Sequence, residues 1–319
     1  MLGGNATVVR EFVLLGLAGP QGQQRRLSAL FLCMYLLTVA GNTLIMLAIG
    51  VDARLHSPMY FFLSNLAMVD VCFSSTTVPQ MAALALSHTR TIPFARCLAQ
   101  LFFFITFVNM DSLLLGVMAY DRYVAICQPL RYAALMRPQL CAGLVAGLWV
   151  LAGLHALLHT ALMARLSFCA SNVVHHFFCD LHPLLQLSCS DVSTNVLVIF
   201  TVGGLLALTP FVLILVSYGA IAAAVLRLAS AQGRGKAFST CGAHLAVVAL
   251  FYGTAIAVYF GPSSSHSPQR DTLSAVMYTV VTPMLNPFIY SLRNRDMKGA
   301  LRGLLCGARA VGGPRPQER

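Results

Sequence analysis

Seven long apolar stretches dominate the chain, and most charged residues lie between them. The stretches are residues 27–51, 58–86, 97–120, 139–164, 192–226, 237–262 and 271–292. Each reaches the roughly 20 residues that a helix needs to cross a hydrocarbon core of about 30 Å. Lipid cannot hydrogen-bond to the backbone, so a spanning segment must be a helix or part of a closed barrel. Runs of this length without alternation predict helices. The fold class is therefore all-α, an integral membrane bundle of seven transmembrane helices.

The composition agrees with a membrane protein and leaves little chain for a soluble domain. Of the 319 residues, 58% are hydrophobic and only 10% are charged, against roughly 25% charged residues in soluble domains. We expect a single domain over 1–319, with an N-terminal segment 1–26, a bundle 27–292 and a tail 293–319. The early apolar segment "EFVLLGLAG" is too short for a cleavable signal peptide, so the first span is expected to direct insertion.

Basic residues in the short loops predict the orientation. Seven spans place the two termini on opposite sides, and an extracellular N-terminus puts 14 of the 21 Lys and Arg residues in cytoplasmic segments. This is the positive-inside bias of membrane proteins. The net charge of +11 is thus a topology signal, and we expect no nucleic-acid partner. The sequon Asn5-Ala6-Thr7 lies in the predicted outer segment, where Asn5 can be glycosylated.

Four of the ten cysteines lie on the predicted outer side, where disulfides persist: Cys97, Cys169, Cys179 and Cys189. Their spacing leaves all three pairings open.

The outer segment "HHFFCDLH" carries a cluster of residues that can ligate metals. His175, His176, Cys179, Asp180 and His182 fall within eight residues, and imidazole with thiolate suits Zn²⁺ or Cu⁺. The favoured alternative is an oxidised Cys179 among ordinary loop histidines.

Several polar residues lie inside the predicted spans, where they are costly and usually functional. Asp121-Arg122 follows the apolar run "LLLGVMAY", and Asp70 and Asp111 lie deep in the second and third spans. Two carboxylates at such depth require either protonation or a bound cation.

His155 and His159 in the fourth span share one helix face. With no acidic third ligand nearby, polar contacts between helices are favoured over a metal site.

Longer motifs resemble a known family. Seven spans with Asp121-Arg122-Tyr123 at the inner end of the third resemble a rhodopsin-like G-protein-coupled receptor. Further stretches are similar to one branch, the class II (tetrapod-type) odorant receptors. They are "LHSPMYFFLSNLA" (55–67), "MAYDRYVAICQPLRY" (118–132), "SFCASNVVHHFFCD" with "LSCSD" (167–191), "SY" (217–218), "KAFSTCGAHL" (236–245) and "PMLNPFIYSLRN" (283–294). Two departures are small, namely Gly242-Ala243 where two serines are common and Asp111 where glutamate is frequent.

The resemblance implies an activation switch at the inner side of the bundle. In the resting state Arg122 is expected to be held by Asp121, and to be released when the inner ends of helices three and six separate. The expected switch residues are Asp121, Arg122, Tyr123, Tyr218, Asn286, Pro287 and Tyr290. The resemblance also implies a Cys97–Cys179 bridge, a Cys169–Cys189 bridge and a short cytoplasmic helix after the seventh span.

The resemblance places the ligand among the outer halves of the helices, beneath the second outer loop. The expected contacts are Phe104, Ile105, Val108, Asn109, Ser112, His159, Val202, Leu206, Tyr252, Ile256, Tyr259 and Thr279. Residues 105, 108, 109 and 112 follow the spacing of one helix face. The set holds no fixed charge, so a small, neutral volatile odorant is expected. The only cofactor expected is Na⁺, because in related receptors the residue at the position of Asp70 helps to hold this ion. The alternative is that Asp70 and Asp111 are both neutralised and hydrogen-bonded within the bundle.

The implied function is an odorant receptor of the plasma membrane, in olfactory cilia, that activates a stimulatory olfactory-type G protein and raises cAMP. Besides membrane lipid, the odorant and this G protein are the expected partners. A transporter or proton pump is disfavoured because no internal repeat and no retinal-type lysine is found. A membrane enzyme is disfavoured because neither HExxH nor GxSxG occurs. One alternative stays open, namely that a receptor of this architecture senses a metabolite in another tissue.

Overall fold

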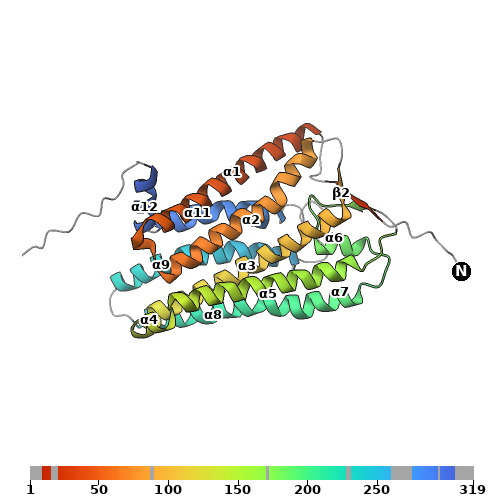
Figure 1. Ribbon diagram of the computed structural model, residues 1–319. Helices are drawn as coiled ribbons and strands as arrows, with labels where there is room; N and C mark the ends of the chain where they lie inside the picture. The colour runs from red at the N-terminus through yellow and green to blue at the C-terminus, as the bar shows by residue number, and fades with distance from the viewer. Residues whose placement is uncertain are drawn as a thin grey trace, which may run out of the picture.

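The computed structural model describes residues 9–15, 21–86, 90–169, 172–227, 231–259, 275–293 and 295–305. Its long helices run side by side along one common direction (Figure 1). Three short strands lie at one end of this bundle, and the last helix, α12, lies at the other. The sequon at Asn5 lies outside the described residues.

In the residues that the structure describes, all seven predicted spans lie in helices, apart from Val192 ahead of α7. The elements are α1 (Gln21–Val51), α2 (Pro58–Leu86), α3 (Phe94–Cys127), α5 (Pro138–Ala164), α7 (Ser193–Val198), the π-helix η3 (Ile199–Gly203), α8 (Gly204–Leu226), α9 (Ala231–Tyr259), the π-helix η5 (Met277–Val281) and α11 (Thr282–Arg293). The fifth span consists of α7, η3 and α8 without interruption, and the seventh of η5 and α11. Five described helices are long and apolar enough to cross a membrane, and Cys241–Ile256 of α9 is a shorter apolar helix.

Some helices extend beyond the apolar stretches. Helix α1 starts at Gln21 instead of residue 27 and includes the exposed Arg25 and Arg26, and α3 continues past residue 120 to Cys127. Backbone hydrogen bonding does not stop where the apolar run stops, and basic side chains are favourable at the membrane surface. The short elements that join the spans are η1 (Ala53–Leu55), η2 (Pro129–Arg131), α4 (Tyr132–Leu135) and α6 (Leu181–Gln186). Helix α12 (Arg295–Leu305) is the short helix expected after the seventh span.

A small sheet at the outer end was not predicted. Strand β1 (Glu11–Leu14) pairs antiparallel with β2 (Thr91–Pro93) and parallel with β3 (Val173–Val174). Along β1, Phe12 and Leu14 are fully buried and Glu11 is exposed, the alternation of a strand with one covered face. The ring of Phe12 meets Phe168 edge to face at 5.2 Å. Strand β1 is therefore part of the folded outer end of the bundle.

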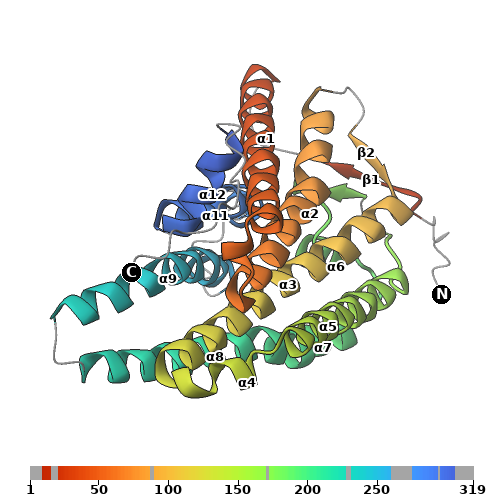
Figure 2. The ribbon, with the colours of Figure 1, turned by 60° about the vertical axis from the view of Figure 1, so that its left-hand side comes forward.

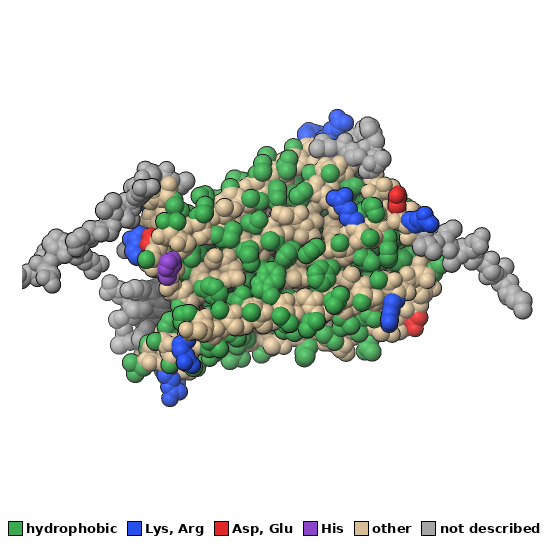
Figure 3. Space-filling view, viewed as in Figure 1, with side chains coloured by type: hydrophobic (Ala, Val, Ile, Leu, Met, Phe, Trp, Pro, Cys, Tyr) green, Lys and Arg blue, Asp and Glu red, His purple; other side chains and the backbone are tan. Residues whose placement is uncertain are grey.

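The surface of the bundle is apolar, and its charges lie at the two ends. In the face shown in Figure 3, hydrophobic side chains cover the middle, whereas Lys, Arg, Asp and Glu gather near the ends. Large apolar side chains of α8 are exposed, including Leu205 (71%) and Val216 (64%). An apolar area of this extent is unfavourable in water, and it matches the hydrocarbon core of a membrane.

Helix α3 lies centrally and packs against α2, α5 and α8 (Figure 2). A Cβ atom added at Gly116 of α3 would lie 2.9 Å from Cβ and 3.2 Å from Cα of Pro210 in α8. A Cβ added at Gly41 of α1 would lie 3.1 Å from Pro287 of α11. At these two crossings the absence of a side chain lets the helices approach closely, as is common in membrane bundles.

Candidate functional site

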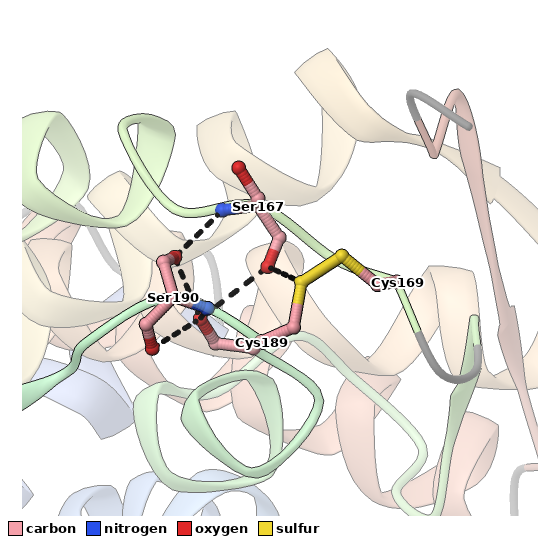
Figure 4. Close-up of a disulfide and its surroundings, with 5 residues drawn as sticks. Ser167, Cys169, Cys189 and Ser190 are labelled. Carbon is pink, nitrogen blue, oxygen red and sulfur yellow. Dashed lines mark hydrogen bonds between the residues drawn. A yellow bond between two sulfur atoms is a disulfide. The ribbon is translucent and has the colours of Figure 1, made fainter. Parts of the chain in front are cut away.

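Two disulfides order the second outer loop. Cys97 at the start of α3 is bonded to Cys179, and Cys169 is bonded to Cys189 within the loop. Both expected pairings are confirmed. Around the second bridge (Figure 4), Cys189 N donates to Ser167 O at 2.9 Å and Ser167 N donates to Ser190 Oγ at 2.9 Å.

The disulfide between Cys97 and Cys179 also bears on the metal alternative. The sulfur of Cys179 is not available as a thiolate ligand, so the cluster in "HHFFCDLH" loses its soft donor. Asp180 caps α6 by accepting a hydrogen bond from Leu181 N at 2.7 Å. Burial raises the pKa of Asp180, and this hydrogen bond opposes the rise. Within the described ranges, no group of three His, Cys, Asp or Glu side chains is arranged to hold a metal ion.

A buried glutamine fixes the loop over the bundle. Gln100 of α3 accepts a hydrogen bond from Cys179 N through Oε1 (2.9 Å) and donates from Nε2 to Thr76 O of α2 (2.9 Å). Next to this contact, the ring of Phe178 lies 4.8 Å from that of Phe104 on α3. The loop is thus anchored above the predicted ligand face of α3.

The predicted face of α3 is apolar apart from two hydrogen-bonded groups. Ile105 is buried and Val108 is half-buried. Asn109 is half-buried, and its Nδ2 donates to Ile105 O at 2.6 Å and to His155 Nδ1 of α5 at 3.1 Å. The buried Ser112 hydroxyl is bonded to the Tyr252 hydroxyl of α9 at 2.8 Å. This face therefore connects α3 to both α5 and α9.

The histidines of α5 extend the polar contact. His155 Nε2 and His159 Nε2 are 3.0 Å apart, and both side chains are buried. A Cβ added at Gly203, the last residue of η3, would lie 3.6 Å from His155 Nε2 and 3.8 Å from His159 Nε2. His155 makes a polar contact with another helix, as favoured from the sequence, whereas His159 is bonded to His155 on its own helix, and η3 passes directly beside the two rings.

The other predicted ligand residues differ in burial. Thr279 of η5 is fully buried and its hydroxyl donates to Ala275 O at 2.7 Å. Leu206 is half-buried, whereas Val202 and Ile256 are 42% and 49% exposed. The side chain of Tyr259 lies outside the described residues. Val202 and Thr279 both lie in π-helices, which are frequent at functional sites.

A groove of about 460 Å³ opens between α2 and α3 and does not involve the predicted ligand residues. Its lining comprises Cys72, Ser75, Thr76, Pro79, Gln80, Arg96, Ala99, Gln100, Phe103 and Phe107. Phe103 and Phe107 lie on a face of α3 other than that of Val108 and Asn109. The groove is therefore separate from the Asn109 contacts.

At the inner end, the expected Asp121–Arg122 ion pair is not formed, and that expectation was wrong for this conformation. Asp121 instead accepts a hydrogen bond from the Tyr132 hydroxyl at 2.8 Å. Neighbouring residues of a helix do not face each other, and the carboxylate of Asp121 points toward Tyr132 of α4. In the described part of the chain, the ion pair present joins Arg54 to Asp52. Burial, followed by the charge of Asp121, raises the pKa of Tyr132.

Two tyrosines of the expected switch are hydrogen-bonded at this end. Tyr218 of α8 is bonded to His244 Nδ1 of α9 at 2.8 Å. The hydroxyl of Tyr123 accepts from Gln128 Nε2 at 3.0 Å. The first contact joins the inner ends of α8 and α9, and the second closes the inner end of α3.

Comparison with known proteins decides the family. The family model described as "Olfactory receptor" matches residues 31–308. The chain belongs to the olfactory receptor family. The receptor is 69% identical to human Olfactory receptor 1C1 over 94% of this chain and 96% of that protein. It is 62% identical to rat Olfactory receptor 1f45 over 95% and 96% of the two chains.

The fold comparison agrees with this assignment. Squid rhodopsin superposes with a TM-score of 0.69 at 18% identity, over 94% of this chain and 90% of that chain. The receptor thus has the seven-helix fold of rhodopsin-like receptors. It is a class II, multi-pass receptor of the plasma membrane and not an enzyme.

The centre of the receptor holds a cluster of buried oxygen atoms. Asn286 of α11 donates from Nδ2 to both carboxylate oxygens of Asp70 at 2.8 and 3.1 Å. Four further oxygen atoms are buried and have no hydrogen-bond partner in the structure: Asp111 Oδ1, Ser74 Oγ, Asn286 Oδ1 and Tyr290 Oη. Asp70 and Asp111 lie close enough to interact electrostatically, so the two acids share one environment. Hard cations are bound by oxygen donors of this type, and the residues present therefore fit a Na⁺ ion.

Sequence reasoning missed three residues that the structure places at these sites. His155, not included in the ligand set, holds Asn109, and its i, i+4 spacing to His159 was the available signal. Tyr132 and His244 lie in the motifs "MAYDRYVAICQPLRY" and "KAFSTCGAHL", but no pattern in the sequence assigns their partners Asp121 and Tyr218.

Proposed function

We propose that the receptor binds a small neutral odorant between α3, α5, the η3–α8 segment and α9, beneath the second outer loop. Binding activates a stimulatory olfactory-type G protein and raises cAMP. The observation that carries this proposal is the α3 face of Ile105, Val108, Asn109 and Ser112, which is apolar with one half-buried amide. Ligand pockets are mostly apolar with a few orienting polar groups.

The chemistry around this face supports a neutral ligand. The expected ligand residues include no Asp, Glu, Lys or Arg, so neither an ammonium nor a carboxylate would find an opposite charge. Aromatic rings at Phe104 and Phe178 cover the outer side of the face. A ligand of about ten heavy atoms makes few contacts, and its affinity is accordingly modest.

The proposed signal passes from Ser112 to α9. Tyr252 is bonded to Ser112 and packs 4.9 Å from Phe211 of α8. A ligand beside Ser112 competes with this contact and favours another position of α9. Farther along the same helix, His244 holds Tyr218, so rotation or tilt of α9 breaks that bond and opens the inner end around Arg122. A ligand shifts such an equilibrium through its differential affinity for the two states.

The G protein would engage the opened inner end. Its C-terminal helix is proposed to contact Arg122, Tyr218 and the segment 227–240. The basic residues Arg227, Arg234 and Lys236 add electrostatic attraction; the side chains of Arg234 and Lys236 lie outside the described residues.

A cAMP reporter assay with Asn109→Leu tests the ligand site. Loss of the amide removes a hydrogen bond to the ligand and leaves the polar group of the ligand unpaired. This costs about 1–3 kcal/mol, or roughly 5- to 150-fold in potency. Leu154→Ala is the matched control, because Leu154 lies on the same helix as His155 and is 60% exposed. Equal potency of oxygenated agonists on the wild type and Asn109→Leu would show that the polar anchor lies elsewhere.

The coupling step has its own test. Arg122→Ala should abolish agonist-driven cAMP at unchanged surface expression, because the G-protein contact is lost. An unchanged cAMP response in this variant contradicts the proposed coupling, whatever the ligand.

The buried oxygen cluster supports a regulatory role for Na⁺. We propose that Na⁺ held by Asp70 and Asp111 favours the resting conformation. Asp70→Asn should shift the agonist concentration curve to lower values and remove its dependence on Na⁺. If the wild-type curve is the same in Na⁺-containing and Na⁺-free medium, the cluster is structural.

A further inference from the structure

We infer that the receptor selects odorants that donate a hydrogen bond, namely alcohols and phenols, over aldehydes, ketones, esters and ethers of the same size. The selecting atom is Oδ1 of Asn109, and His155 acts as a positioning residue. This inference rests on the proposed function and narrows it. Its basis is the number of hydrogen-bond donors and acceptors that Asn109 still has available.

The orientation of the Asn109 amide is determined by its own helix. The side-chain atom nearest to Ile105 O lies 2.6 Å from that carbonyl oxygen. A backbone carbonyl can only accept, so this atom must be the nitrogen Nδ2, because an oxygen there would bring two acceptors together. The same nitrogen lies 3.1 Å from His155 Nδ1. Both N–H groups of the amide are therefore engaged within the protein.

The same logic assigns the two histidine tautomers. His155 Nδ1 accepts from Asn109, so it carries no proton and the proton of the neutral ring is on Nε2. That Nε2–H donates to His159 Nε2 at 3.0 Å, which must then be unprotonated. The chain runs in one direction, from Asn109 through His155 to His159, with neutral rings. Reversing it would require Asn109 Nδ2 to accept a hydrogen bond, which an amide nitrogen does not do.

The atom left over is the carbonyl oxygen of Asn109. The Asn109 side chain is half-buried, and its two hydrogen bonds are both made by Nδ2. A ligand hydroxyl that donates to Oδ1 gains a hydrogen bond in an apolar surrounding. A ligand carbonyl or ether brings a second acceptor to this oxygen and leaves both unpaired, which is the costly case for buried polar atoms. Sites that discriminate on a hydrogen-bonding group reach large selectivity for this reason.

The hydroxyls of the ligand set can also accept a hydrogen bond from a ligand, and they differ in whether they can still donate one. The Thr279 hydroxyl already donates to Ala275 O. The Ser112 and Tyr252 hydroxyls are bonded to each other, and one of their two hydrogens stays available. A carbonyl ligand could use that hydrogen, so the experiment includes Tyr252→Phe to separate this group from Asn109.

The experiment uses the full-length receptor in cells with a cAMP reporter, and ligands that differ only in their oxygen group. A panel of primary and secondary alcohols is compared with the methyl ether and the aldehyde or ketone of each carbon skeleton. For every carbon skeleton that activates the receptor, the alcohol should be at least about tenfold more potent than the corresponding ether and the corresponding carbonyl compound. This comparison on the wild type needs no variant to fold.

His155→Leu provides the second arm. Removing the imidazole frees one N–H of Asn109, so the amide can then donate to a carbonyl ligand. The ratio of alcohol potency to ketone potency should fall by about tenfold, at surface expression equal to that of Leu154→Ala. A role of His155 in packing alone would weaken both ligands equally and leave this ratio unchanged, which would overturn its assignment as a positioning residue.

The outcomes separate the inference from the proposed function. Alcohols and their ethers of equal potency on the wild type overturn the inference and leave an odorant receptor. An alcohol preference that is lost in Tyr252→Phe but retained in Asn109→Leu also overturns it, because the selecting group is then the Tyr252 hydroxyl. If no neutral volatile of any oxygen class raises cAMP while charged ligands do, the proposed function fails as well.

Discussion

Replacing Gly116 with Ala should push apart α3 and α8, which leave no room for a side chain at this position. The new Cβ would lie 2.9 Å from Cβ of Pro210 and 3.2 Å from its Cα. Ordinary contacts of this kind begin at 3.4 Å, so α3 and α8 must move apart by several tenths of an ångström. The Cα of Pro210 belongs to the helix backbone and cannot rotate away as a side chain can. Overpacking of this kind costs about 1–3 kcal/mol.

Gly153→Ala is the matched control for this change. A Cβ at Gly153 of α5 would meet nothing within 4 Å. Both substitutions gain the preference of alanine over glycine in a helix, about 1 kcal/mol, and the difference between the two variants isolates the overpacking at Gly116. Thermal unfolding of the purified receptor in detergent measures that difference. Equal melting temperatures of the two variants, with equal agonist potency, would refute the argument.

Three further changes test other contacts. Tyr132→Phe removes the hydrogen bond to Asp121 that positions α4, so the maximal cAMP response should fall while agonist binding, measured by displacement, stays unchanged. Gln100→Leu leaves the Cys179 amide without its acceptor, and the melting curve should show a loss of about 1–3 kcal/mol; an unchanged curve would mean that another group takes over. Breaking the Cys97–Cys179 bridge, which closes a loop of 82 residues, should lower the free energy of unfolding by about 4–5 kcal/mol through chain entropy. Breaking the Cys169–Cys189 bridge, which closes 20 residues, should lower it by about 3 kcal/mol. The reverse order in unfolding assays would contradict this expectation.

The spans were predictable from the sequence because a membrane imposes one requirement on every segment that crosses it. Long apolar runs have to be helical in lipid, whatever their neighbours are. Helix ends were less predictable, since the first turns of α1 lie in the polar interface and include Arg25 and Arg26. The disulfide pairing of Cys97 with Cys179 required the resemblance, because four outer cysteines alone allow three pairings.

The contacts at the site depend on how the helices are rotated against one another, which a single sequence does not encode in a readable way. The i, i+3, i+4 pattern placed Asn109 and Ser112 on one face of α3. It gave no partner for either, and the bonds to His155 and Tyr252 join residues 46 and 140 positions apart. For Asp121 and Arg122, the resemblance implied a pair that this conformation does not form, because Asp121 is bonded to Tyr132 instead.

Strand β1 has a consequence for the biosynthesis of the receptor. Its edge partner Val173 is synthesised 159 residues after Leu14, and chain elongation at about 5–20 residues per second takes on the order of 10–30 s over that distance. During this time the segment with Phe12 and Leu14, both fully buried in the finished receptor, has β2 as its only strand partner and lacks β3 on its other edge. An apolar strand with an unpaired edge is a site for wrong association. Strand β1 is thus made early but completes its sheet late, and the yield of receptor at the cell surface depends on how well this short strand is protected until the second outer loop arrives.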